Sequence, residues 1–159
     1  MSERFGTDGR AAVVKRALEE ARQRGDRRLG TDHLLLGLLH DPRSSAARAL
    51  GIDLDSARTA WDALDRAALA AIGLDVGGIS LANLPPSHKR PPLTSAARAA
   101  LLRAVQEAAR AKRRRPAEAH VLLALLACEP PDPAAELLAQ LGVDRALVRD
   151  RLTGSAGCA

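Results

Sequence analysis

Apolar residues recur along this chain at intervals of three and four positions, which is the spacing of one buried helix face. The first such stripe runs from Val14 to Ala21, and Glu20 is expected on the opposite, solvent-facing side. Residues 34–39 are apolar on almost every side, so this second stretch is predicted to be a central, buried helix. The pattern predicts an all-α protein.

Start and stop signals divide the pattern into eight predicted helices. Thr31 is typical of an N-cap, Gly25 of a helix end, and Pro116 of a first helical turn. The first predicted helix ends at Gly25 and the second runs from Thr31 to a stop at Pro42; the others cover about residues 45–50, 54–72, 95–111, 116–128, 133–141 and 144–152.

The second half of the chain repeats the first. Residues 7–39 return without a gap 87 positions later as residues 94–126, and Leu50–Asp53 matches Leu141–Asp144 at a slightly longer offset. Two copies joined by one linker predict a pseudo-twofold domain rather than a solenoid, which needs more repeats. We therefore expect two four-helix repeats packed into one bundle, with Gly37 and Ala124 at the closest approaches of the central helices.

The domain boundaries follow from this repeat. A single domain is expected over residues 3–152, with repeat 1 at about 5–72, repeat 2 at about 93–152 and a flexible tail at 153–159. The connector, residues 73–92, contains paired glycines and paired prolines that rule out a continuous helix. Each repeat is too small to bury a large core alone, so the two are expected to share one.

Composition narrows the class of protein further. Of 159 residues 47% are hydrophobic, yet Phe5 and Trp61 are the only aromatic ones, so the core must consist of alanine and leucine. Trp61 is expected to anchor that core. Cys128 and Cys158 have no metal-site spacing and indicate a reducing compartment, the cytoplasm. We expect no signal peptide and no membrane segment, because no run approaches about 20 apolar residues.

The net charge of +5 is concentrated in one stretch. Residues 89–115 hold nine basic side chains against one acid, Glu107. The basic patch comprises Lys89, Arg90, Arg110, Lys112, Arg113, Arg114 and Arg115 together with Arg98 and Arg103. Such a patch fits a nucleic acid, a phospho-group or an acidic protein, or else a solvated helix face. Nucleic acid is the less favoured partner, because no aromatic side chains are interleaved for stacking on bases.

Two motifs carry a resemblance to a known family. Arg4-Phe5 with Thr7, and the stretch from Gly30 to Leu39, resemble the Clp repeat that opens the ClpC/ClpA-type unfoldases. The resemblance covers roughly residues 3–152 and includes the Leu-Gly-Ile/Val-Asp turns before the last helix of each copy. It differs from the family pattern in four places: Gly6 is inserted, Asp32 replaces the usual Glu, Pro116–His120 replaces Gly-Thr-Glu-His, and the connector is longer than the family's.

The resemblance implies a docking platform of the Clp proteolytic system rather than an enzyme. A stand-alone copy is expected to act as adaptor, modulator or decoy for the adaptors and substrates of a Clp unfoldase. Phospho-arginine proteins and cyclic peptide antibiotics are further implied ligands. The chain contains no Gly-Lys pair, hence no phosphate-cradling ATPase loop, and no Gly-x-Ser-x-Gly nucleophile motif. No cofactor is expected, and the protein is expected to be a monomer.

Candidate ligand residues follow from the same resemblance. Asp32 is expected to receive the guanidinium of phospho-arginine at one competent site, since Ala119 occupies its place in the second repeat. The full candidate set is Phe5, Thr7, Thr31, Asp32, Leu93, Thr94 and Glu118. His33 and His120 are interpreted as core histidines, and no metal site is expected. Two alternatives stay open: a basic helical regulator that binds nucleic acid through residues 89–115, and the N-terminal fragment of a longer unfoldase.

Overall fold

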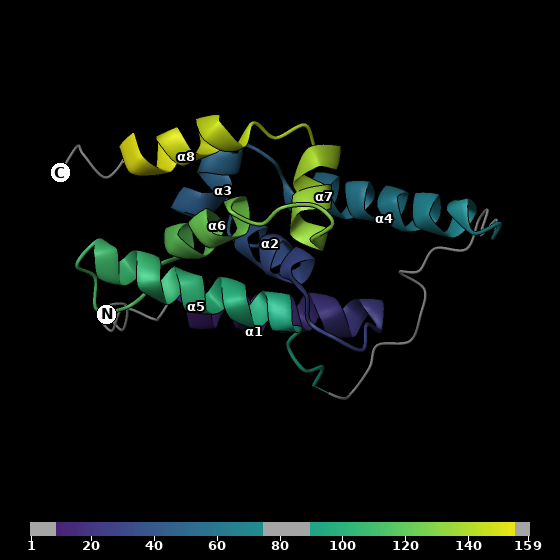
Figure 1. Cartoon of the computed structure of the whole chain (residues 1–159), viewed down its shortest axis with the longest axis horizontal. Helices are drawn as coiled ribbons and strands as arrows, with labels where there is room; N and C mark the ends of the chain where they lie inside the picture. The colour runs from purple at the N-terminus through teal and green to yellow at the C-terminus, as the bar shows by residue number, and fades with distance from the viewer. Residues whose placement is uncertain (1–8, 75–89, 155–159) are drawn as a thin grey trace.

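The computed structural model of the chain describes residues 9–74 and 90–154, and within them it contains eight helices arranged as two four-helix repeats (Figure 1). The first repeat contains α1 (Gly9–Arg24), α2 (Thr31–Leu39), α3 (Ser45–Leu50) and α4 (Leu54–Ala71); the second contains α5 (Ser95–Arg110), α6 (Glu118–Leu126), α7 (Pro133–Gln140) and α8 (Arg145–Gly154). The predicted all-α fold is confirmed. In Figure 1, α2 and α6 lie at the centre, α1 and α5 run along one side, and α8 runs along the other.

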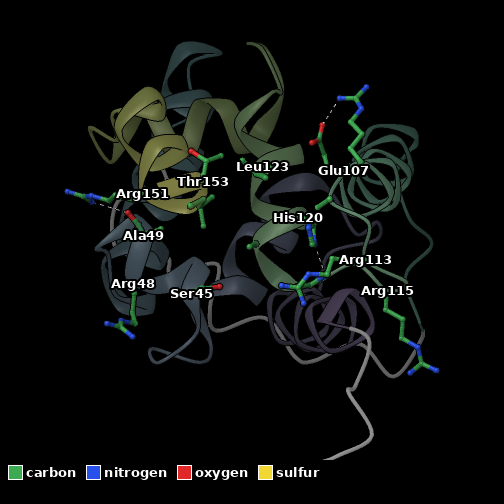
Figure 2. Close-up of a pocket in the computed structure, with 15 residues that line it drawn as sticks. Ser45, Arg48, Ala49, Glu107, Arg113, Arg115, His120, Leu123, Arg151 and Thr153 are labelled. Atoms are coloured by element: carbon green, nitrogen blue, oxygen red, sulfur yellow. Dashed lines mark hydrogen bonds and ion pairs between the residues drawn. The ribbon is translucent and has the colours of Figure 1, made fainter. Parts of the chain in front are cut away.

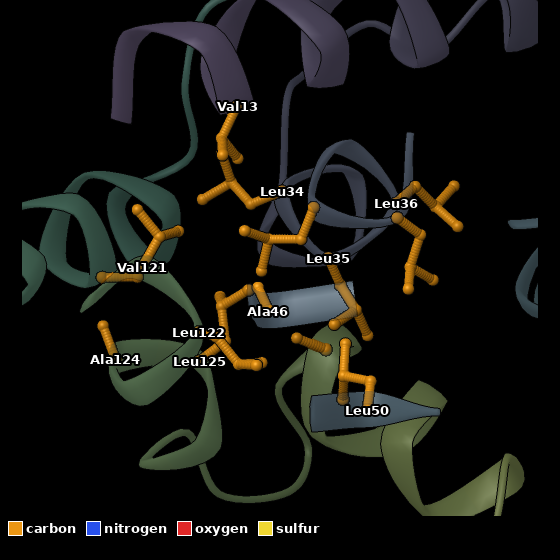
Figure 3. Packing of buried hydrophobic residues seen from close by; sticks show 14 of the residues in the cluster. Val13, Leu34, Leu35, Leu36, Ala46, Leu50, Val121, Leu122, Ala124 and Leu125 are labelled. Atoms are coloured by element: carbon orange, nitrogen blue, oxygen red, sulfur yellow. The ribbon is translucent and has the colours of Figure 1, made fainter. Parts of the chain in front are cut away.

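The core is formed where the two central helices meet. Leu34 and Leu35 of α2 and Leu122 of α6 are at most 1% exposed, and Figure 3 shows them converging with Leu50 of α3. A single cluster of buried apolar residues extends through both repeats. Helix α2 contacts α5, α6 and α7, and α3 contacts α8, so the repeats interlock rather than merely touch.

Gly37 lets α1 and α2 approach each other closely. A Cβ atom at this position would lie 2.7 Å from the Val13 carbonyl oxygen and 3.1 Å from the Ala17 nitrogen. Any side chain would therefore force the helices apart. Gly37 is thus a point of close approach for its helix, and its counterpart Ala124 is fully buried.

The buried stripe of α1 differs from the predicted one at a polar position. Val13, Ala17, Glu20 and Ala21 are buried, whereas Val14 is only half-buried. The prediction that Glu20 faces solvent is wrong. Its carboxylate is 2% exposed because it accepts hydrogen bonds from Arg58 of α4 and pairs with the His40 ring at 2.7 Å.

The central helices begin at other residues than the sequence indicated. Gly30, not Thr31, is the N-cap of α2, and α6 begins at Glu118, two residues after Pro116. In both helices a histidine at the third position accepts a hydrogen bond from the N-cap amide: Gly30 N to His33 Nδ1 is 3.0 Å, and Ala117 N to His120 Nδ1 is 2.9 Å. This hydrogen bond satisfies the N-cap amide and fixes the start of each helix.

Both ends of the described segments depart slightly from the predicted boundaries. Helix α8 continues to Gly154, into the predicted tail, while residues 155–159 lie outside the described part. Of the predicted connector, residues 75–89 lie outside it as well. Within residues 9–74 and 90–154, no helix has the length and apolar character that a membrane crossing requires.

Candidate functional site

Helix starts from opposite repeats meet in pairs. The residues before α2 and α5 form an isolated parallel bridge, in which Leu29 N–H donates to Pro92 O and Thr94 N–H donates to Leu29 O, both at 2.9 Å. The start of α1 also lies against the start of α6, since a Cβ on Gly9 would be 2.7 Å from the Glu118 nitrogen. Each pair of helix starts is accompanied by a surface cavity.

The first cavity, here called the acidic cleft, lies beside the starts of α2 and α5 and has a volume of about 350 Å³. Its lining combines three carboxylates with two arginines and an indole: Asp26, Arg27, Arg28, Gly30, Asp32, His33, Trp61, Asp65, Thr94 and Pro133. The structure thus brings two predicted ligand residues, Asp32 and Thr94, into one cleft. Asp26 and Asp65 were not predicted.

The Arg24 side chain packs behind two residues that line the acidic cleft, Trp61 and Asp65. The Arg24 guanidinium lies 4.0 Å from the Trp61 ring centroid and pairs with Asp62 at 2.9 Å and Asp65 at 2.6 Å. Burial raises the pKa of Asp65 against the opposing charge of Arg24. Trp61 is 7% exposed and contacts His33 edge-on at 4.7 Å, which confirms the prediction that it anchors the core.

His33 lies at the bottom of the acidic cleft between two carboxylates. Its Nε2 is 2.8 Å from Asp26 Oδ2, and its Nδ1 is 3.2 Å from Asp32 Oδ1. Burial lowers the pKa of His33, but the hydrogen bonds with Asp26 and Asp32 outweigh it and raise the pKa to about 9. Nδ1 accepts the hydrogen bond from Gly30 N only while the ring is neutral; in the charged ring Nδ1 carries a proton and donates to Asp32 instead. Asp32 also accepts a hydrogen bond from the His33 amide at 2.9 Å. The predicted acid is thus held in place by the helix that presents it.

Thr31, which was predicted as a ligand residue, lines none of the three cavities described in this section. It is completely buried, its hydroxyl donates to Asp132 Oδ1 at 2.8 Å, and the hydroxyl oxygen accepts from Ala134 N at 3.2 Å. Both partners stand at the start of α7, so the side chain is drawn into the contact between repeats. Thr31 therefore forms a structural link between the repeats, and its ligand role stays a prediction.

The second cavity, here called the Glu118 cleft, lies beside the starts of α1 and α6 and has a volume of about 660 Å³. Glu118 pairs with Arg16 at 3.0 Å, and its Oε2 atom is buried without a hydrogen-bond partner among the described residues. Three arginines of the basic patch, Arg113, Arg114 and Arg115, line the same cavity. The predicted residues Phe5 and Thr7 lie outside the described residues.

Leu93 and Thr94 hold structural positions at the start of α5. Leu93 is half-buried against the core, and the Thr94 hydroxyl accepts a hydrogen bond from Ala97 N at 3.1 Å as the N-cap of α5. Their proposed contacts with ligands stay predictions.

The third cavity is the largest of these three, about 850 Å³, and is here called the basic pocket. Figure 2 shows Arg48 and Arg151 on one side of it and Arg113 and Arg115 on the other, with His120 between them. Ala49, Ala119, Leu123 and Leu152 also line this pocket. His120 is half-buried at this surface, so the interpretation of His120 as a core histidine is wrong.

The pocket gathers only part of the basic patch predicted from sequence. Arg110, Arg113 and Arg115 line it, and Arg110 pairs with Glu107 at 3.2 Å. Lys89 lies outside the described residues, while Arg90 and Lys112 are exposed and do not line this pocket. Arg48 and Arg151, from other parts of the chain, were missed because only the fold brings them here.

The repeat alignment explains why this pocket is open. At the offset of 87 residues Arg24 corresponds to Ala111 and Asp26 to Arg113, and at the longer offset Trp61 corresponds to Leu152. The side chains that cover His33 in the first repeat are thus small or opposite in charge around His120. Burial lowers the pKa of His120, and the nearby Arg113 lowers it further.

No three histidine, cysteine, aspartate or glutamate side chains of the described residues are grouped as metal ligands would be. Cys128, the cysteine within the described part, is half-buried after α6, and burial raises the pKa of its thiol.

Sequence comparison finds relatives of the first repeat. Residues 7–75 match the family model of the Clp repeat (R) N-terminal domain. The chloroplastic chaperone protein ClpC2 of Oryza sativa subsp. japonica is 41% identical over 78 residues, which are 47% of this chain and 8% of that protein. The chloroplastic ClpA homolog CD4B of Solanum lycopersicum is 42% identical over 69 residues, again 8% of its length. The chain thus matches less than a tenth of the length of these curated relatives.

Comparison of structures extends the likeness to both repeats. The N-terminal domain of the chaperone ClpD from Arabidopsis thaliana superposes with a TM-score of 0.66 at 21% identity, covering 98% of this chain and 99% of that one. The Hsp104 N-terminal domain from Candida albicans gives 0.62 at 19% identity, covering 96% and 92%. The chain therefore has the fold of a Clp N-terminal domain, and the sequence of its first repeat matches the Clp repeat model.

Proposed function

We propose that this chain is a non-catalytic protein-interaction module of the Clp system, which binds the adaptors and substrates that Clp unfoldases receive. The fold and the Clp repeat support this proposal. Further support comes from the cavities, which lie where helix starts of the two repeats meet and offer charged groups to a partner. Acting in the cytoplasm as a monomer, the module would serve as adaptor, modulator or decoy.

The acidic cleft is the proposed site for a phosphorylated arginine. The observation that carries this proposal is the placement of Asp32 and Thr94, from different repeats, in one cleft beside Trp61. The guanidinium of the ligand would pair with the Asp32 carboxylate, and the phosphoryl group would face Arg27 and Arg28. In the second repeat Ala119 stands in place of Asp32, and Glu118 is already paired with Arg16. One competent site is therefore expected.

Isothermal titration calorimetry with free phospho-arginine tests this site. Wild type is expected to bind with a stoichiometry of one, and Asp32→Ala is expected to lose binding while keeping its melting temperature within a few degrees. Glu19→Ala, which removes an exposed carboxylate elsewhere on α1, is the matched control and should bind normally. Two equivalent sites, or undiminished binding by Asp32→Ala, would refute the assignment.

The wider proposal concerns protein partners and has its own test. The purified chain, immobilised and exposed to an isolated Clp unfoldase adaptor or an unfolded substrate such as casein, should retain that protein at physiological salt. Light scattering after size exclusion should give the mass of one chain for the free protein, and cell fractionation should place it in the cytoplasm. Failure to retain either protein would count against the module as a whole.

A further inference from the structure

The two central histidines have the same cap but different surroundings. His33 Nδ1 accepts from the Gly30 amide, and its Nε2 meets the Asp26 carboxylate at 2.8 Å. His120 Nδ1 accepts from the Ala117 amide in the same way, yet its Nε2 has no hydrogen-bond partner among the described residues. A neutral ring whose Nδ1 is an acceptor carries its proton on Nε2. The second repeat thus has an N–H donor where the first has a donor paired with a carboxylate.

The space next to the histidine ring is filled in the first repeat and open in the second. In the first repeat Trp61 packs edge-on against His33 at 4.7 Å and Arg24 covers the indole. In the second, the equivalent positions hold Leu152 and Ala111, and both line the basic pocket. Its volume of about 850 Å³ lies within the roughly 300–1,000 Å³ of pockets that bury a drug-sized ligand. The second repeat therefore lacks the aromatic side chain and the carboxylate of the first, and its pocket has room for a ligand that supplies both groups.

The charges around the pocket select the kind of ligand. Five arginines line it, namely Arg48, Arg110, Arg113, Arg115 and Arg151, against the single carboxylate of Glu107. That carboxylate pairs with Arg110, whereas Arg48 and Arg113 form no ion pair with any described residue. Guanidinium groups bind carboxylates through paired, charge-assisted hydrogen bonds. The lining between them is apolar, with Leu123 and Leu152, which suits a side chain rather than a sugar-phosphate backbone.

We propose that the basic pocket is a docking site for an acidic peptide segment of a partner protein, which inserts an aromatic or large apolar side chain next to a carboxylate. The inserted side chain occupies the place that Trp61 has in the first repeat, and the carboxylate takes the place of Asp26 on His120 Nε2. This rests on the proposed function, because it names a second class of partner for the same interaction module. Nucleic acid fits less well, since no aromatic side chain among the described lining residues can stack on a base.

Fluorescence anisotropy with a short labelled peptide, carrying acidic residues on both sides of one tryptophan, tests the proposal. Wild type is expected to bind it. Replacing the tryptophan by alanine, or the acidic residues by their amides, should each weaken binding at least tenfold. Arg113→Glu and Arg48→Glu should do the same from the protein side, because each removes a charge-assisted pair. Arg98→Glu, an equal charge change on an exposed part of α5 outside the pocket, is the matched control and should bind within about twofold of wild type.

A filled pocket provides the decisive variant. Leu152→Trp rebuilds in the second repeat the residue that closes the first, so it should abolish peptide binding while the protein keeps its melting temperature. Phospho-arginine binding in the acidic cleft should be unchanged in Leu152→Trp and Arg113→Glu, and lost only in Asp32→Ala. Failure of the peptide site is thereby distinguished from failure of the proposed function. Peptide binding that survives both Arg113→Glu and Leu152→Trp would overturn the proposal. So would duplex DNA that binds wild type more tightly than the peptide does and no longer binds Arg113→Glu.

Discussion

The two repeats share one backbone plan but differ in how they treat an equivalent histidine. Around His33, Asp26 and Trp61 complete a negatively charged environment in which the ring itself is buried. Around His120, Arg113 and Leu152 leave an open, positively charged one. The hydrogen bond from the N-cap amide is the same in both, 3.0 Å and 2.9 Å. The comparison shows that the helix cap belongs to the fold, whereas the charge and accessibility of each site are set by a few replaceable neighbours.

The largest effect is expected from the part of the molecule that the two repeats share. Leu35→Ala and Leu122→Ala should each lower the free energy of unfolding by about 2–5 kcal/mol, because each leaves a cavity in the common core. Leu102→Ala, whose side chain is 60% exposed, should change it by less than about 0.5 kcal/mol. Urea unfolding followed by circular dichroism should show one cooperative transition. Two separate transitions would mean that the repeats fold as independent units.

The next effect distinguishes the equivalent glutamates of the two repeats. Glu20→Gln should cost about 1–3 kcal/mol, because it weakens buried hydrogen bonds to Arg58 and His40. Glu107→Gln should cost less than about 0.5 kcal/mol, because its partner Arg110 is 76% exposed. Equal losses of unfolding free energy in the two variants would show that the burial of Glu20 does not make its carboxylate more important for stability than that of Glu107.

The contribution of Glu20 to stability should depend on pH in a defined direction. Burial raises the pKa of Glu20, but the hydrogen bonds from Arg58 and His40 outweigh it and hold the pKa below the ordinary value of 4.5. The resulting stability is present above pH 4.5 and is lost as the pH falls through the lowered value. Glu20→Gln should therefore flatten the loss of stability in acid.

The histidines themselves should titrate in opposite directions from the ordinary value of 6.5. The pKa of His33 is raised to about 9 and that of His120 is lowered. The stability that His33 contributes is complete below pH 6.5 and disappears as the pH rises through about 9. Proton NMR titration should give His33 the higher pKa; Asp26→Asn should lower it, and Arg113→Asp should raise that of His120. A His120 that titrates above His33 in wild type would reverse the electrostatic assignment.

The smallest effect concerns the helix starts that meet between repeats. The resemblance to the Clp repeat implies an aromatic residue at each start, whereas this chain has Leu93 at the second. Leu93→Phe should bind a cyclic peptide antibiotic directed at unfoldase N-domains about 2- to 10-fold more tightly, since an aromatic pair adds ~0.5–1.5 kcal/mol. Leu102→Phe, on the exposed face of α5, serves as control. If Phe5→Ala binds the compound unchanged, the ligand role of both positions is refuted.

Much of the fold follows from the sequence because its determinants are local or repeated. Helix periodicity, Gly37 and the all-apolar second helix of each copy together predict the bundle and its central pair. Glu20 could not be placed, because its partners Arg58 and His40 come from helices and loops that only the fold brings together. Among the expected ligand residues, Asp32 and Thr94 line one cleft, while the Thr31 hydroxyl bonds to the start of α7 in the other repeat, a contact that the sequence did not indicate.

The basic pocket was missed for a different reason. The pocket exists because two side chains are smaller than their counterparts in the first copy. Position 152 is leucine instead of tryptophan, and position 111 is alanine instead of arginine. A run of basic residues in the sequence indicates charge but not a hollow. Comparing the two copies residue by residue, rather than only noting that they match, is the signal that would have found it.

The cross-repeat link from Thr31 to Asp132 and Ala134 gives the domain the character of a dimer made within one chain. In a dimer of identical subunits every interface residue occurs twice, so the two histidine sites would have to be both acidic or both basic. Joining the two halves covalently removes that symmetry requirement. Asp26 and Arg113 can then coexist, and one small fold can present two surfaces of opposite charge to different partners.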